Sequence, residues 1–150
     1  MNEVLTALPD ELFAHLQKEK FVLLSTIDTD SGGPANNAIS WVYATNPGNL
    51  RFAVDARSRI VGNLSANPQC SVMFFATGAV HAVYGTAKPV TEALEGVPFK
   101  LACYDIEIDA IRNAMFYGAR IAVEPEYEKT YDKRAAEKLD NQVYDAMKKA

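Results

Sequence analysis

The strongest constraint on the fold is a series of short apolar runs, each bounded by turn-forming residues. The clearest run is LRFAV, in which Leu50, Phe52 and Val54 share one face and the intervening residues share the other. The runs CSVMFFA and AVHAVYGTAKPV are separated only by Thr77 and Gly78, which predicts a tight hairpin. The pattern therefore indicates a chain built mainly from short strands.

Further runs extend this pattern on both sides. The sequence predicts strands at residues 21–27, 35–45, 99–108 and 119–123, with a short helix at 109–114. Clusters of Asp, Asn, Gly and Pro at 28–34 and 46–49 are typical of turns. Gly85 lies inside a strand, which predicts a bulge or a close approach of two backbones.

Helices are expected at both ends and once in the middle. At the N-terminal end the helical spacing is carried by Leu5, Leu8, Leu12 and Leu16. The last helix is expected to begin near Asp132 and to bury a stripe formed by Ala136, Leu139, Val143 and Met147. In the middle, Ser58 is placed to cap a short helix that Asn67 and Pro68 end.

These elements predict one domain over residues 1–150, mainly β with flanking helices. We expect a small antiparallel barrel of six strands, with one helix between the third and fourth. An open α+β sheet is the alternative, because strand spacing alone does not separate the two architectures.

Composition limits the classes of function. The net charge of −4 argues against nucleic-acid binding, which needs a clustered cationic surface. No apolar run reaches the ~20 residues of a membrane helix, and the first residues do not resemble a signal peptide. Cys70 and Cys103 lie in apolar runs, as buried thiols of a cytoplasmic protein do. His15 and His81 have no second ligand at metal spacing, so no metal site is predicted.

The segment DARSRIVGNLSANPQ holds the clearest candidate site. Arg57, Ser58 and Arg59 stand where a strand gives way to a helix. Guanidinium groups, a hydroxyl and the amides of a helix start together suit an anion, most simply a phosphate. The alternative is a capped helix with two surface arginines. Asp28 and Asp30 are interpreted as solvated turn residues, and no Gly-x-Ser-x-Gly or Cys-His motif indicates a catalytic nucleophile.

The same segment carries a family resemblance. Its order of strand, basic turn, helix and strand resembles the pyridoxamine 5′-phosphate oxidase-like family of FMN-binding split barrels, over roughly residues 10–123. The residues that carry the resemblance are Arg57, Ser58, Arg59, Asn63, Leu64, Asn67 and Pro68. The resemblance implies a six-stranded antiparallel split β-barrel, FMN as the cofactor, and a homodimer with two sites at the subunit interface.

The resemblance also implies where FMN would lie. Arg57, Ser58 and Arg59 would hold its phosphate, with Asn63 in support. Val54 and Asp55 would close the ribityl side. The second strand would run beside the isoalloxazine ring, through Asn37, Ala38, Ile39, Ser40 and Trp41, although a core or interface role is equally open for Trp41.

The resemblance thus implies a flavin-dependent oxidoreductase that acts on a small-molecule substrate or electron donor. The chain ends in the helical sequence DAMKKA, where true oxidases carry an arginine-rich strand that grips pyridoxal phosphate, so we do not expect that substrate. The alternative function is a non-catalytic module that binds haem, a deazaflavin or another ligand. His81 is a candidate haem ligand, although a structural role for it, either buried or on the strand surface, is favoured.

Overall fold

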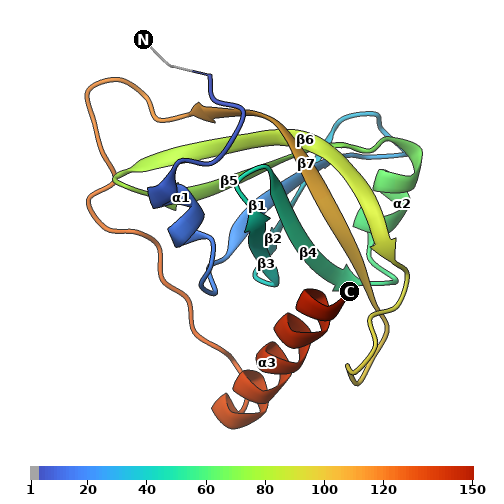
Figure 1. The fold of residues 1–150 in the computed structure, drawn as a ribbon. Coiled ribbons are helices and arrows are strands. Elements are labelled where there is room, and N and C mark those ends of the chain that lie inside the picture. The colour runs from blue at the N-terminus through green and yellow to red at the C-terminus, as the bar shows by residue number, and fades with distance from the viewer. Residues whose placement is uncertain (1–3) are drawn as a thin grey trace.

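The computed structural model describes residues 4–150, in which three helices flank an antiparallel β-sheet (Figure 1). The elements in chain order are α1 (Asp10–His15), β1 (Val22–Ile27), β2 (Pro34–Ile39), β3 (Val42–Asn46), β4 (Asn49–Asp55), α2 (Arg59–Ala66), β5 (Gln69–Ala76), β6 (Ala79–Thr91), β7 (Leu101–Asn113) and α3 (Lys133–Lys149). The prediction of a mainly β chain with flanking helices is confirmed.

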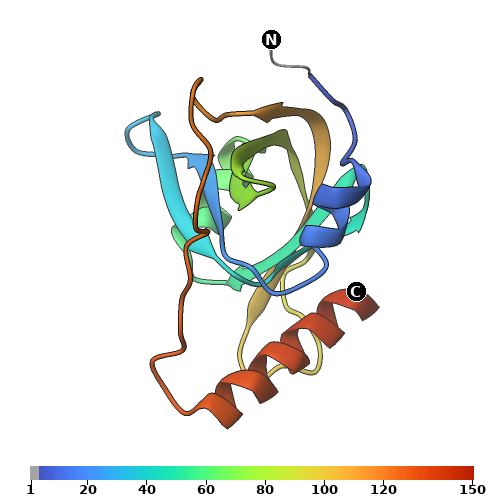
Figure 2. The same cartoon turned by 90° about the vertical axis from the view of Figure 1, so that its left-hand side faces the viewer.

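The sheet has seven strands in the order β2-β1-β5-β6-β7-β4-β3, and all neighbours are antiparallel. It curls strongly, with α1 on one side and α3 below it (Figure 2). Within residues 4–150, β2 and β3 are the sheet edges and do not pair with each other, so the sheet is not closed by a ladder.

The prediction of a six-stranded barrel is wrong, because the sheet has seven strands. The segment 35–45, expected as one strand, forms two. Residues 34–39 pair with β1, whereas residues 42–46 pair with β4 at the other end of the sheet. The chain changes partner at Ser40 and Trp41. Residues 34–39 read PANNAI and are poor in strand-forming residues, so the composition gives no signal of a separate ladder before Val42.

The short helix at 109–114 and the strand at 119–123 were also wrongly predicted. β7 continues unbroken to Asn113, and its last residues pair with the start of β6. Burial of Ile111 on that ladder, where it is 2% exposed, stabilises the extended form. Residues 119–123 form no strand; Ile121 makes one backbone hydrogen bond, to Gly78.

The β5–β6 hairpin confirms two predictions from glycine. Its turn places Thr77 at φ 54° and Gly78 at φ 75°, the left-handed conformation that a two-residue hairpin of this twist needs at both positions. At Gly85 the register shifts, and a Cβ atom there would lie 2.4 Å from the Glu107 carbonyl oxygen. Only glycine allows β6 and β7 to approach so closely.

Two apolar clusters lie on opposite faces of β4 and β7. Phe52 and Ile106 belong to the larger cluster inside the sheet, whereas Cys103 packs in a second cluster with Val143 and Met147 of α3. The predicted stripe of α3 is thus largely confirmed, and Asp132 caps that helix through the Arg134 amide. Within residues 4–150, no helix combines the length and apolar content needed to cross a bilayer.

Candidate functional site

The candidate site is built on the turn between β4 and α2. The side chain of Asp55 accepts a hydrogen bond from the Arg57 amide at 2.8 Å, which shapes the turn. Ser58 then caps the helix, because its Oγ accepts from the Ile60 amide at 3.2 Å. The cap predicted at Ser58 is therefore confirmed.

Asn63 fixes α2 to the rest of the molecule. It is 2% exposed, and its Nδ2 donates to Thr26 Oγ1 of β1 at 3.0 Å. Its Oδ1 accepts from the Thr29 amide at 3.2 Å. One buried amide side chain thus holds the helix against both β1 and the loop that follows β1, as a supporting residue for the turn would.

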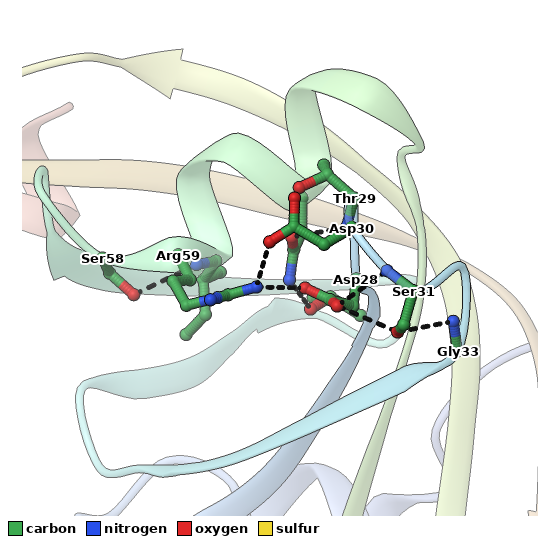
Figure 3. Close-up of polar contacts among 10 residues, drawn as sticks. Asp28, Thr29, Asp30, Ser31, Gly33, Ser58 and Arg59 are labelled. Atoms are coloured by element: carbon green, nitrogen blue, oxygen red, sulfur yellow. Dashed lines mark hydrogen bonds and ion pairs between the residues drawn. The ribbon is translucent and has the colours of Figure 1, made fainter.

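Both arginines of the turn are engaged by carboxylates. The Arg59 guanidinium donates to Asp28 at 2.5 Å and to Asp30 at 3.2 Å, across the gap between α2 and the β1–β2 loop (Figure 3). Arg57 pairs with Asp55 at 3.2 Å within its own turn. The side chains remain accessible, with Arg57 91% and Arg59 70% exposed.

These contacts set the charge of the site. Hydrogen bonds from Arg59 and from Ser31 lower the pKa of Asp28, and the hydrogen bond from Arg57 lowers the pKa of Asp55. Both carboxylates therefore stay ionised near neutral pH. Three carboxylates face two guanidinium groups, so an anion that binds at this turn must compete with them.

The second group of expected site residues follows β2. Asn37 and Ala38 are exposed, and Ile39 is half-buried, on a strand whose outer edge pairs with no strand in residues 4–150. β2 begins beside the β1–β2 loop that Arg59 contacts and runs away from it at ~3.3 Å per residue. The expected site residues of β2 therefore lie farther from Arg59 than the start of the strand does.

Ser40 and Trp41 contact α3. The Trp41 Nε1 donates to Asp140 at 2.9 Å, and its ring centroid lies 6.3 Å from that of Phe99. Tyr144 donates its hydroxyl hydrogen to the Ser40 carbonyl oxygen at 2.5 Å. The roles of Asp140 and Tyr144 could not be predicted, because about 100 residues separate them from their partners.

Val54 and Asp55 complete the set of expected residues. Val54 is 6% exposed and packs in the core, so it offers a site chiefly its backbone. Asp28 and Asp30, interpreted from the sequence as solvated turn residues, do lie in the β1–β2 turn, and the Asp30 side chain is 80% exposed. Both also pair with Arg59, which the sequence did not predict. Arg59 and Asp28 are 31 positions apart, so no short sequence motif indicates that they pair.

A model of the pyridoxamine 5′-phosphate oxidase family matches residues 8–137. The chain belongs to this family. No curated protein matches the sequence.

Solved structures share the fold of this pyridoxamine 5′-phosphate oxidase family member. A pyridoxamine 5′-phosphate oxidase-like protein from Lactobacillus delbrueckii is 16% identical, with a TM-score of 0.61. The match covers 71% of this chain and 94% of the Lactobacillus chain. HupZ from Group A Streptococcus is 14% identical with a TM-score of 0.59, covering 77% and 99%. An F420 reductase is 17% identical with a TM-score of 0.59, covering 69% and 98%.

His81 is not presented as a free ligand in this family member. Its Nε2 lies 3.0 Å from the Ala76 carbonyl oxygen and 2.9 Å from Thr77 Oγ1, and its ring stacks on Phe74 with centroids 5.6 Å apart. The carbonyl contact requires a proton on Nε2. Burial, more than this hydrogen bond, determines its pKa, which is lowered. The histidine therefore has a structural role at the β5–β6 turn.

Proposed function

We propose that the chain is an FMN-binding flavoprotein, a flavin-dependent oxidoreductase that works as a homodimer on a split-barrel scaffold. The observation that carries the proposal is the turn before α2. It places Arg57, Ser58 and Arg59 at the start of an eight-residue helix, in a chain of the pyridoxamine 5′-phosphate oxidase family.

The donors of this turn fit a phosphate. Both guanidinium groups are exposed enough to reach a ligand, and the Ser58 hydroxyl can donate while its lone pair accepts from the Ile60 amide. Phosphates bind well at helix starts, where amide hydrogens point outward. The carboxylates compete for the arginines but do not bury them, so a phosphate can take their place.

The direction of β2 fits the rest of the ligand. With the phosphate at the turn, an elongated molecule can follow β2 away from the β1–β2 loop, past Asn37 and Ala38 toward Trp41. Asn63 would keep α2 in position, and Val54 and Asp55 would border the middle of the ligand. This placement uses all of the residues that the family resemblance suggests.

A bound flavin would supply the hydride or electron transfer of such an enzyme. The residues of the chain would hold the phosphate, orient the ring through the backbone of β2, and keep water from one side of it. No acid–base side chain is needed for this role.

Binding of FMN to the purified protein tests the proposal through quenching of flavin fluorescence. Arg57→Ala and Arg59→Ala should each weaken binding about tenfold, because each removes a charge-assisted hydrogen bond to the phosphate for which a carboxylate already competes. Arg134→Ala, at the exposed start of α3, is the control and should leave affinity unchanged. Unchanged affinity in both turn variants would rule out the phosphate site.

A second candidate is a binding module for a deazaflavin, favoured by the shared fold of the F420 reductase. Haem is the other alternative, but the bonded Nε2 of His81 makes it a poor axial ligand. The absorption spectrum of protein incubated with each cofactor in turn distinguishes the three. A deazaflavin that binds more tightly than FMN would favour this second candidate.

A further inference from the structure

A pocket of about 430 Å³ lies between α2, the last residues of β6 and the first residues of β7. These elements are adjacent on the right of Figure 1. Ile60 and Asn63 turn one face of α2 into the molecule, whereas Val61 and Ser65 line the pocket. None of the residues assigned above to FMN lines it.

Tyr104 gives this pocket a hydroxyl that can bond to a ligand. The residue is 6% exposed and lines the pocket, yet its hydroxyl makes no hydrogen bond to any residue between 4 and 150. Its ring is held in place by stacking on Phe52, with centroids 5.3 Å apart and planes inclined by 18°. No buried side-chain nitrogen or oxygen within residues 4–150 lacks a hydrogen-bond partner, so this hydroxyl is open to solvent through the pocket and can bond to a ligand.

One charge of each sign stands at the rim of the pocket. Lys100 and Glu92 both line it and are both exposed, and neither forms an ion pair in the described part of the chain. The floor between them is apolar, formed by buried Leu64, Ala87 and Ala102. A ligand of a single charge would satisfy one rim residue and be repelled by the other.

We propose that this pocket binds a small zwitterion with an apolar body, the chemistry of an apolar α-amino acid. Its carboxylate would pair with Lys100 and accept from the Tyr104 hydroxyl. Its ammonium group would pair with Glu92. Its side chain would lie over Leu64 and Ala102, in a volume typical of small-molecule sites.

Three probes with the same body test the charge requirement by titration calorimetry: L-phenylalanine, 3-phenylpropanoate and 2-phenylethylamine. L-phenylalanine should bind at least tenfold more tightly than either singly charged probe. Equal affinity of all three probes, or no binding of any, would overturn the proposal.

Three variants test the contacts. Tyr104→Phe, Lys100→Met and Glu92→Gln should each weaken L-phenylalanine about tenfold, or ~1.4 kcal/mol. Lys138→Met on the exposed face of α3 is the matched control and should bind as the wild type does. Tyr104→Phe keeps the ring and its stacking, so a loss there reports on the hydroxyl.

Competition with FMN separates this pocket from the proposed cofactor site. L-phenylalanine binding should persist at saturating FMN and in Arg59→Ala. Displacement by FMN would show that the pocket belongs to the flavin site and would overturn the inference. Failure of FMN to bind would leave the L-phenylalanine result standing, since the two sites share no residue.

Discussion

Arg59 uses the same terminal nitrogen to contact Asp28 and Asp30, but the two carboxylates differ in what else they do (Figure 3). Asp28 also accepts from the amide and hydroxyl of Ser31 and so shapes the loop. The Asp30 side chain is 80% exposed and bonds only to Arg59 within the described chain. Asp30 therefore acts chiefly as a competitor for whatever anion the turn binds.

Replacing Asp30 should strengthen FMN binding. Asp30→Asn removes one negative charge beside Arg59 without disturbing the contacts of Asp28, so we expect the dissociation constant to fall severalfold, with the largest effect at low salt. Fluorescence titration at two ionic strengths measures it. Asp145→Asn on α3 serves as the control. Weaker binding in Asp30→Asn would mean that Asp30 organises the site instead of competing for it.

Local chemistry explains which contacts of the site could be read from the sequence. The cap at Ser58 depends on residues two positions apart, so the sequence predicted it. The Arg59 pairs and the Trp41 contact with Asp140 join segments that only the folded chain brings together. A motif reports which groups are present at a turn, whereas their partners depend on the tertiary structure.

Among the elements, β6 and β7 show how pairing overrides local preference. Residues 109–114 were expected to be helical, but the long ladder to β6 holds them extended as far as Asn113. The bulge at Gly85 lets both strands bend together around the core. That bend could be predicted from one glycine, because no other residue fits there.

Gly85→Ala should therefore destabilise the fold. Its new methyl group would lie 2.4 Å from the Glu107 carbonyl oxygen and 2.6 Å from Ile106 Cγ2, so the ladder must shift, at a cost of ~2–3 kcal/mol. Gly62→Ala is the matched control: Gly62 lies within α2 with open space around it, and alanine should stabilise by ~0.5–1 kcal/mol. Urea unfolding measures both. An unaltered midpoint for Gly85→Ala would contradict the close approach.

For the whole molecule, the outer face of β1 and β5 is the best candidate for self-association. Leu23 and Met73 are opposite each other in the ladder, and Phe75 lies two residues further along β5; all three are only half-buried. The exposed edge of β2, with Ala38 beside Leu23, continues this surface. A second copy of the chain would cover these side chains.

We accordingly expect the wild type to have twice the mass of the chain by light scattering, and Met73→Lys to be monomeric. A lysine at a contact that loses water on association carries a large desolvation cost. Val123→Lys, at a 79% exposed position, is the control and should remain dimeric. A monomeric wild type at micromolar concentration would exclude the dimer.

The two apolar clusters impose a restriction on the β4–β7 pair. Phe52 faces one cluster and Ala53 the other, and Tyr104 and Cys103 divide in the same way, so successive side chains are shielded in both directions. This double cover is limited to residues 52–54 and 101–104, because Glu107 and Asp109 further along β7 are exposed to solvent. New specificity can therefore arise along β2, the exposed side of α2 and the loops with little effect on folding, while these doubly covered segments tolerate little change in side-chain volume.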